Sequence, residues 1–470
     1  MFAKIQRVHF VGIGGIGMSG IAEVLLNLGY KVSGSDLKLS PVTNRLCEIG
    51  ATVFTGHSPD NVSGADVVIV SSAVTRDNVE VLAAHERHIP VIQRAEMLAE
   101  LMRLKYGIAI AGMHGKTTTT SMVAAVLAAG GLDPTVVVGG RVDAMGSNAR
   151  LGKSQYLVAE ADESDRSFLK LSPILAVVTN IDREHMDCYG DMNDVRNTFR
   201  EFMDRVPFYG MIVACNDNDE LRRLLPSVER RIVTYGTQPD SDFQITNVRY
   251  APRTGIEALS SFCVSYQGSH LGEFHLRVPG EHNIENAAAA IAVGIGLDVP
   301  AEDIRRALEH FSGVDRRFQQ IGTANGVTVI DDYGHHPTEI RATLAAARQC
   351  GFRRTHVIFQ PHRYTRTQLL LDEFATAFQN ADSLLVLDIY PASEPPIPGI
   401  TSELLADRIL KAGGRQATYV SSSAEAIKLA ACAAESGDMV LTLGAGNVWQ
   451  LGPRVLEELN NRVPSAAHRP

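Results

Sequence analysis

The 470-residue sequence lacks several features that mark specialised classes of protein. Its six cysteines are scattered and form no Cys-x-x-Cys pair, so neither a zinc site nor a disulfide framework is predicted. No apolar run reaches the roughly 18 residues of a membrane span, and the N-terminus has no signal-peptide pattern. We therefore expect a cytoplasmic protein with reduced thiols and no membrane insertion.

Positive charge is also scarce, because 44 Lys and Arg stand against 53 Asp and Glu, for a net charge of -9. This balance argues against a dedicated nucleic-acid binder. No fixed sequence period is present, which excludes a solenoid. What the chain does have is 45% apolar and 21% charged residues, an ordinary globular composition with ample core. At roughly 150 residues per domain, its length predicts about three domains.

Short β-rich apolar runs alternate with longer helical patterns through most of the chain. This alternation predicts an α/β fold with mostly parallel sheets. We expect a Rossmann-like domain over 1–104, a P-loop-type ATPase domain over 105–314 and a second Rossmann-like domain over 315–470. Patches at 243–246 and 262–265 resemble antiparallel strands added to the second domain. The strands are predicted at 8–11, 67–70, 108–111, 157–159, 176–179, 357–359, 384–387 and 440–443.

A first glycine cluster follows the strand at 8–11 and precedes a helix over about 18–28. Gly12, Gly14 and Gly17 fit G-x-G-x-x-G, a tight turn whose bare backbone lets a diphosphate reach a helix N-terminus. A dinucleotide cofactor and a diphosphate sugar such as a UDP-sugar present the same group, and a turn that only packs a helix on a strand is the third reading. The residues predicted to bind this nucleotide are Gly14, Gly15, Ile16, Gly17, Asp36, Ser71 and Ser72.

A second glycine cluster lies between the strand at 108–111 and an apolar helix. A lysine and a hydroxyl residue at such a turn form a phosphate cradle, in which Lys116 neutralises the β- and γ-phosphates and Thr117 binds Mg²⁺. The spacing is G-x-x-G-K-T, with Ile110 where the commoner motif has glycine. The residues predicted to bind ATP here are Gly112, Met113, His114, Gly115, Lys116, Thr117 and Thr118.

Acidic groups and a histidine follow the next two predicted strands. Glu160 comes directly after the strand at 157–159, and His185 follows the strand at 176–179. Consecutive parallel strands place both on the edge that carries Lys116. Carboxylates suit Mg²⁺, so we predict Thr117, Glu160 and His185 as metal ligands. A solvated loop is the competing reading of this acidic run, and it is favoured more for Glu163 and Asp165.

At these residues the chain resembles the Mur ligases, the ATP-dependent amino-acid-adding enzymes of peptidoglycan synthesis. The resemblance spans nearly the whole chain. It implies adenine contacts for Asn283 and Asn286, an ATP-phosphate contact for Arg317 and a ribose contact for Asp332. It places His335, Arg363 and Arg366 on the amino-acid and carboxylate side, and makes Lys116, Glu160, His185 and Arg317 the catalytic set. The segments that carry it are 11–20, 112–118, 160–165, 185–187, 279–287, 315–318, 331–339 and 360–366.

The resemblance also implies a reaction. The lactyl carboxylate of UDP-N-acetylmuramate would attack the γ-phosphate of ATP, and the amine of L-alanine would then attack the acyl phosphate, with Mg²⁺ as cofactor. Segments 331–339 and 360–366 favour this alanine-adding branch over the recycling branch that attaches a tripeptide. Closure of the domains is expected, as is a monomer or weak homodimer. Several family members use a carbamylated lysine after the metal histidine, but 194–204 contains no lysine.

Readings from other classes explain less of the chain. A nicotinamide-dependent oxidoreductase rests on the first glycine cluster and leaves Lys116 and Glu160 without a role. A regulatory ATP-binding protein without ligase activity predicts phosphate release that is indifferent to amino acid and sugar nucleotide. A folate-polyglutamate ligase would share the ATP domain but not the turn at Gly12 to Gly17 or the segment at His335.

Overall fold

The computed structural model of the chain describes residues 5–71, 73–142, 147–252, 259–413 and 416–462. By contacts the chain divides into two compact units. The first comprises Met1–Asn247, Cys263–Phe274 and Glu285–Phe311, and the second comprises Val248–Phe262, His275–Ile284 and Ser312–Pro470. No helix among the described residues is long and apolar enough to cross a membrane.

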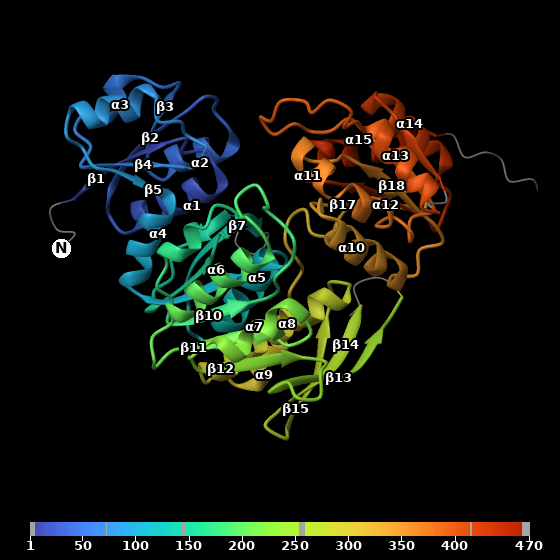
Figure 1. The fold of residues 1–470 in the computed structure, drawn as a ribbon, viewed down its shortest axis with the longest axis horizontal. Helices are drawn as coiled ribbons and strands as arrows, with labels where there is room; N and C mark the ends of the chain where they lie inside the picture. Colours follow the sequence, from blue (N-terminus) through green and yellow to red (C-terminus); the bar gives the residue numbers. More distant parts are fainter. Residues whose placement is uncertain (1–4, 72, 143–146, 253–258, 414–415, 463–470) are drawn as a thin grey trace, which may run out of the picture. The chain divides into compact units, whose positions relative to one another are not determined.

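The N-terminal sheet of the first unit is wholly parallel, with the strand order β3-β2-β1-β4-β5 (Figure 1). This doubly wound order places a ligand crevice at the carboxyl ends of the strands, beside β1. The predicted Rossmann-like domain is confirmed. Its strands are β1 (Arg7–Val11), β2 (Lys31–Asp36), β3 (Thr52–Thr55), β4 (Val67–Val70) and β5 (Val91–Gln93), and its helices are α1 (Ile16–Asn27), α2 (Pro41–Glu48), α3 (Val79–Glu86) and α4 (Arg94–Arg103).

A ten-stranded sheet follows, in the order β15-β14-β13-β12-β11-β10-β6-β9-β7-β8. The parallel strands β6, β9 and β10 lie side by side near its centre, which brings the loops after them to one edge. The strands are β6 (Tyr106–Ala111), β7 (Thr135–Val142), β8 (Ser147–Arg150), β9 (Tyr156–Glu160), β10 (Leu175–Val178), β11 (Met211–Cys215), β12 (Ile232–Gly236), β13 (Phe243–Tyr250), β14 (Ser260–Tyr266) and β15 (Ser269–Leu276). The helices are α5 (Lys116–Ala129), α6 (Met192–Asp204), α7 (Asp219–Leu224), α8 (Glu281–Gly296) and α9 (Ala301–Glu309).

One strand prediction for this region is partly wrong. The patch at 243–246 was expected in an antiparallel strand, but β13 pairs with its neighbour β12 in parallel, with Tyr235 opposite Phe243. Buried and partly exposed residues alternate at the start of β13 and along β14. Successive side chains of a strand point to opposite faces of the sheet, and only one face of these strands packs against the core. Local alternation therefore identified the strands but did not determine their direction.

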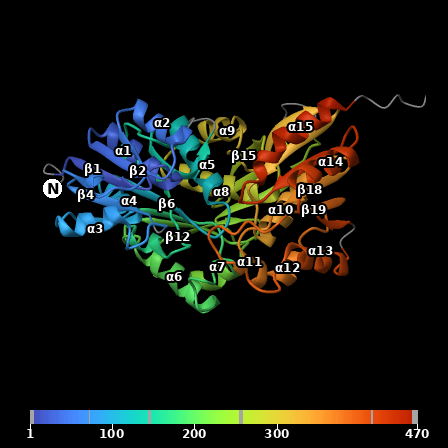
Figure 2. The same cartoon turned by 90° about the horizontal axis from the view of Figure 1, so that it is seen from above.

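The sheet of the second unit has the order β16-β17-β21-β18-β19-β20, antiparallel at β16–β17 and parallel elsewhere. Helices α14 and α15 cover one face, and α10, α12 and α13 cover the other (Figure 2). Its strands are β16 (Gln319–Ala324), β17 (Val327–Asp332), β18 (Thr355–Phe359), β19 (Ser383–Val386), β20 (Ala417–Tyr419) and β21 (Met439–Leu443). Its helices are α10 (Pro337–Gln349), α11 (Tyr364–Leu369), α12 (Leu371–Ala375), α13 (Ser402–Lys411), α14 (Ser423–Ala433) and α15 (Leu451–Asn461).

All eight strands predicted from apolar runs overlap a strand of the structure. The signal was clear because a central strand of a parallel sheet is covered by helices on both faces, so nearly every residue is apolar. In β21, for example, all five residues are buried. The apolar tract that begins at Ala287 lies in α8, where residues 287–293 are buried.

A buried carboxylate is linked to the first glycine turn through Ser35. Glu80, on α3, is fully buried, and its Oε2 accepts a hydrogen bond from Ser35 Oγ at 2.5 Å. The backbone oxygen of Ser35 in turn accepts the N–H groups of Gly12 and Ile13. Burial alone would raise the pKa of Glu80, but hydrogen bonds from His9, Ser35 and Asn61 outweigh it and lower that pKa from 4.5 to about 2.

This network predicts an acid-sensitive contribution to stability. Because the folded-state pKa of Glu80 lies below its unfolded value, its stabilisation is complete above about pH 5 and is lost as the pH falls from 4.5 toward 2. The full contribution is at most about 3 kcal/mol. Urea unfolding followed between pH 5 and pH 3 should show a shallower loss of stability for Glu80→Gln than for the unmodified chain. Glu86→Gln, an exposed change on the same helix, is the control, and equal slopes for all three proteins would contradict the prediction.

Candidate active site

The loop between β6 and α5 owes its shape to two glycines and to the loop after β10. Gly112 has φ +136° and Gly115 has φ +82°, a region in which L side chains are strained. Asn180 Oδ1 accepts the backbone N–H of His114 at 2.9 Å, and Thr179 Oγ1 donates to the His114 carbonyl at 2.7 Å. These contacts fix the turn at the N-terminus of α5, where backbone N–H groups that lack a partner within the helix can bind an anion.

Lys116, the first residue of α5, is folded back over this loop. Its Nζ donates to the carbonyl oxygens of Gly112 at 2.7 Å and Met113 at 3.2 Å, and to Glu163 Oε1 at 2.8 Å. Burial by itself would lower the pKa of Lys116, but the Glu163 carboxylate outweighs it and raises that pKa. The lysine is therefore a fixed positive charge, with 18% of its side chain exposed.

Glu163 corrects the reading of the acidic run as a solvated loop. Its side chain is only 1% exposed, and its Oε1 contacts both Lys116 Nζ and, at 3.5 Å, His185 Nε2. Tyr189 OH donates to its backbone oxygen at 2.6 Å. His185 has φ +55°, so its place beside Glu163 depends on an uncommon backbone conformation. Glu163 thus links two of the residues that the sequence predicted as catalytic.

A cavity of about 380 Å³ joins the two glycine-rich turns. Among the predicted residues, Gly15, Gly17 and Ser71 line it from the N-terminal domain, and Lys116 of α5 and Glu160 of β9 line it from the central domain. The sequence placed these groups on separate domains; tertiary structure brings them to one space. The lining residues are Gly15, Gly17, Met18, Ser71, Arg94, Leu98, Lys116, Val137, Val138, Glu160 and Asp162.

The first turn is fixed by Asp36, which was predicted to bind the nucleotide. Its Oδ2 accepts the N–H of Gly14 at 2.9 Å, and a Cβ added to Gly14 would lie 2.8 Å from that oxygen. Glycine is therefore required at this position for the carboxylate to approach. The side chain of Ile16 and the whole of Ser72 lie outside the described residues.

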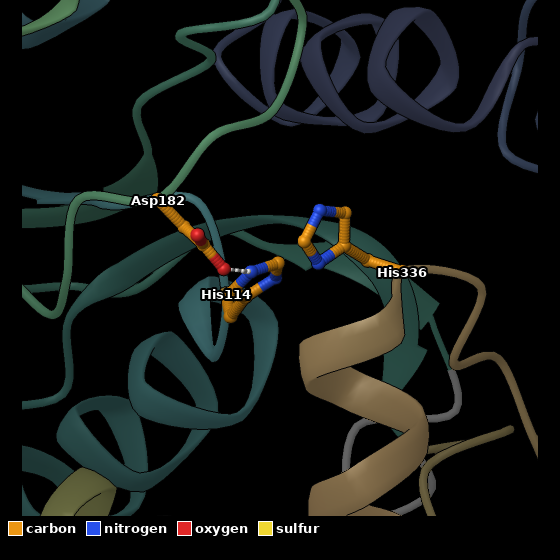
Figure 3. Close-up of side chains that lie close together, drawn as sticks. All are labelled: His114, Asp182 and His336. Carbon is orange, nitrogen blue, oxygen red and sulfur yellow. Dashed lines mark hydrogen bonds and ion pairs between the residues drawn. The ribbon is translucent and has the colours of Figure 1, made fainter. Parts of the chain in front are cut away.

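His114 is held by an acidic side chain of the neighbouring loop. Figure 3 shows its ring facing Asp182, with 2.9 Å between Nε2 and Oδ2. His336, also drawn there, caps α10, since its Nδ1 accepts the N–H of Thr338 at 3.3 Å. Met113 and Thr118 are buried, at 4% and 8% exposed, so an ATP contact from either is expected through the backbone.

The two predicted adenine ligands already make contacts within the chain. Asn286 Oδ1 accepts a hydrogen bond from Thr119 Oγ1 at 3.0 Å and lies 2.6 Å from where a Cβ on Gly115 would be. Asn283 Nδ2 donates to the Pro279 oxygen at 2.6 Å. Asn286 therefore supports the phosphate loop, and adenine binding by both residues stays a prediction.

In the second unit, Asp332 anchors the segment that follows α9. Its Oδ2 accepts the N–H of Phe318 and its Oδ1 that of Gly334, both at 2.7 Å. Burial raises its pKa to about 6 against the opposing effect of Arg317. Arg317 lies 5.1 Å over the ring of Tyr333 and 3.6 Å from Glu339. Both oxygens of Asp332 are thus engaged, and its ribose contact stays a prediction.

His335, Arg363 and Arg366, predicted for the amino-acid side, lie around His362. The ring centroids of His335 and His362 are 5.7 Å apart, and Arg366 Nη1 is 3.1 Å from His362 Nδ1. Burial, His335 and the arginines lower the pKa of His362 to about 3, so its ring is neutral. The ring of Tyr390 stacks on that of His362, with 5.6 Å between the ring centroids. The carbonyl oxygen of Tyr390 accepts a hydrogen bond from the N–H of Arg363 at 2.8 Å.

The residues around the β6–α5 loop suit a divalent cation. Glu160 and the hydroxyl of Thr117 supply the hard oxygen ligands that Mg²⁺ prefers. Among the described residues, Glu163 Oε2 is a buried carboxylate oxygen without a hydrogen-bond donor, a costly state that a nearby cation would relieve.

Several functional candidates were missed in the sequence. Arg94 and Asp182 stand in no local motif, so only the fold reveals them. Glu163 lay in the acidic run, but nothing in its neighbours distinguished a buried carboxylate from a solvated one. His362 stood in a segment that carried the family resemblance, and its contacts with His335 required tertiary structure.

A lysine-bearing loop and a diphosphate-type glycine turn in one cavity define a nucleotide-dependent α/β enzyme. Three family models match the chain: the Mur ligase family catalytic domain over residues 7–106, the Mur ligase middle domain over 110–294, and the Mur ligase glutamate ligase domain over 316–446. The chain belongs to the Mur ligase family, and the predicted class of ATP-dependent ligase is confirmed. The exact domain limits at 104 and 314 stay predictions.

Relatives at high identity bear one name. UDP-N-acetylmuramate–L-alanine ligase of Koribacter versatilis is 70% identical, over 99% of this chain and 100% of its own, and that of Acidobacterium capsulatum is 62% identical over the same shares. Among solved structures, the UDP-N-acetylmuramate–alanine ligase of Thermotoga maritima matches with a TM-score of 0.80 at 31% identity, over 96% of this chain and 98% of that one. A murein peptide ligase of Psychrobacter arcticus matches with a TM-score of 0.70 at 25% identity, over 97% and 99%.

Substituting Gly115 tests the geometry of the loop. Gly115→Ala adds a left-handed strain of about 1 kcal/mol and a Cβ 2.6 Å from Asn286 Oδ1. Gly131→Ala, beyond the other end of α5, adds the same kind of strain at φ +77° but meets nothing within 4 Å. ATP affinity measured by calorimetry should fall in the first variant and stay unchanged in the second. Equal affinities in the two variants would show that Asn286 does not shape the loop.

Proposed function

We propose that the chain joins L-alanine to the lactyl carboxylate of UDP-N-acetylmuramate at the expense of ATP, forming ADP and phosphate in peptidoglycan precursor synthesis. The observation that carries the proposal is the single cavity lined by Gly15, Gly17, Lys116 and Glu160. It allows one anionic substrate to rest its diphosphate on the first turn while its carboxylate approaches the phosphate loop. The names of the relatives supply the identity of the sugar nucleotide and the amino acid.

In this mechanism the chain supplies mainly positioning and charge. The backbone N–H groups at the start of α5 and the ammonium of Lys116 receive the phosphates of ATP, and Glu163 keeps that ammonium protonated and directed into the loop. The substrate carboxylate attacks the γ-phosphorus, and the resulting acyl phosphate is attacked by the amine of alanine. Holding the reactants in line lowers the barrier without any covalent bond to the protein.

Mg²⁺ is the proposed cofactor: Thr117 and Glu160 would hold one ion, and His185 would hold a second. When bound it supplies charge neutralisation at the β- and γ-phosphates and at the reacting carboxylate. Glu163 contacts both Lys116 and His185 and so would orient these two side chains. Residues 194–204 contain no lysine that could be carbamylated. The second Mg²⁺ would therefore be held by His185 and the carboxylates beside it.

The remaining substrate contacts are proposed residue by residue. Arg317 receives ATP phosphate, Asp332 the ribose, and Asn283 and Asn286 the adenine. Arg363 and Arg366 receive the carboxylate of alanine beside His335, since a guanidinium fork matches a carboxylate. We also propose a cytoplasmic location and a monomeric or weakly dimeric chain that binds no nucleic acid.

The tripeptide ligase of cell-wall recycling is the competing function. The murein peptide ligase from Psychrobacter arcticus shares the fold at 25% identity. The alanine-adding relatives reach 70% over the full chain, which favours the smaller amino acid. A nicotinamide-dependent oxidoreductase leaves the Lys116 loop and the second unit without a role.

Phosphate release distinguishes these functions. With ATP and Mg²⁺, we expect release to require both UDP-N-acetylmuramate and L-alanine. Glycine should be used less well, because the loss of one methyl contact costs about 1–3 kcal/mol. UDP-N-acetylglucosamine, which lacks the lactyl carboxylate, is the matched control. Faster release with the tripeptide would favour the recycling ligase, and release indifferent to both substrates would favour a regulatory ATPase.

Lys116→Ala tests the assignment of the two nucleotide sites. Loss of the charge that offsets the γ-phosphate should lower kcat by about 100-fold or more, while affinity for UDP stays nearly constant because its diphosphate rests on the first turn. Lys153→Ala, an exposed change, is the control for the turnover assay. Calorimetry that showed loss of UDP binding together with turnover would contradict separate sites.

A further inference from the structure

Among the described residues that line the cavity, two are cations, Lys116 and Arg94. Arg94 is the first residue of α4, directly after β5, and no motif in the sequence draws attention to it. Its side chain is 22% exposed, so its guanidinium borders both the protein interior and the cavity. The proposed function gives it no role so far.

The guanidinium of Arg94 is held at one end by Asp162. Its Nη2 donates to Asp162 Oδ2 at 2.9 Å, while Asp162 Oδ1 accepts the N–H and the hydroxyl of Ser164 at 3.1 and 2.6 Å. Asp162 lies just after β9, in the central domain, whereas Arg94 follows a strand of the N-terminal sheet. The pair thus orients a cation of one domain with a carboxylate of the next.

The other end of the guanidinium reaches the start of α1. A Cβ added to Gly17 would lie 3.0 Å from Arg94 Nη1 and 3.1 Å from its Cδ. The absence of a side chain at position 17 is therefore what admits the arginine beside the first turn of the helix. An anion at that helix start would meet backbone N–H groups on one side and Nη1 on the other.

We infer that Arg94 is a further ligand of the sugar-nucleotide diphosphate, oriented by Asp162. This inference rests on the proposed function and adds a residue to its binding site. A guanidinium has five donors, so Arg94 can keep its bond to Asp162 and still donate to phosphate oxygens. The contact would also explain why the third glycine of the first turn is needed here: it makes space for the arginine.

Three ligands test the assignment by calorimetry without ATP: UDP, UDP-N-acetylglucosamine and UDP-N-acetylmuramate. Arg94→Ala should weaken all three by a similar factor of about tenfold or more, because all three share the diphosphate and lose the same charge-assisted hydrogen bonds. Asp162→Asn should weaken them less, since the arginine stays and loses only its orientation. Arg45→Ala is the matched control, because Arg45 pairs with Glu23 at 2.9 Å in the same domain but does not line the cavity.

Three results would overturn the inference. One is unchanged affinity in Arg94→Ala. Another is a loss confined to UDP-N-acetylmuramate, which would place Arg94 on the lactyl carboxylate. The third is a loss of affinity in Asp162→Asn as large as that in Arg94→Ala. That result would mean that the ion pair acts by joining the two domains and not by binding the diphosphate.

A second variant covers the case in which Arg94→Ala does not fold. Arg94→Lys keeps the charge with fewer donors and should weaken the three ligands severalfold; unchanged affinity would overturn the inference. If the unmodified chain bound none of the three ligands, both the proposed function and the inference about Arg94 would fail. If it bound them and the Arg94 variants behaved like Arg45→Ala, only the inference would fail.

Discussion

The contact between Lys116 and Glu163 is the interaction on which the rest of the site depends. A buried lysine is tolerated only with a paired charge, and Glu163 Oε1 at 2.8 Å provides it. The same carboxylate meets His185, so one acidic side chain organises the phosphate loop and the neighbouring loop together. Removing it would leave the Lys116 ammonium with only backbone carbonyl oxygens as partners and no carboxylate to balance its charge.

The two glycine turns obey the same physical rule. In each, a side chain from another element approaches so closely that a Cβ would collide with it: Asp36 at Gly14, Arg94 at Gly17 and Asn286 at Gly115. Glycine at these positions therefore does more than permit a tight turn. It makes room for polar groups that hold the turn or border the cavity, and it brings the backbone of the turn into contact with residues distant in the sequence.

Much of the fold was predictable because its physical causes are local. Strands such as β4 and β21 are buried on both faces, so their apolar runs stand out, and glycines mark the turns after β1 and β6. The direction of β13 was not predictable, because alternation of burial is the same in parallel and antiparallel strands. The burial of Glu163 was equally hidden, since its partners Lys116 and His185 are distant in the sequence.

The sequence by itself determined the α/β class, the family and the two glycine turns after β1 and β6, because these depend on periodicity and on residues close together along the chain. Only the tertiary structure decided that both turns open into one cavity, that Asp36 and Asn286 brace those turns, and that Arg94 lies beside Gly17. The physical reason is that these are contacts between separate elements: the carboxyl ends of the strands and the N-terminal ends of the helices meet only when the sheets are assembled.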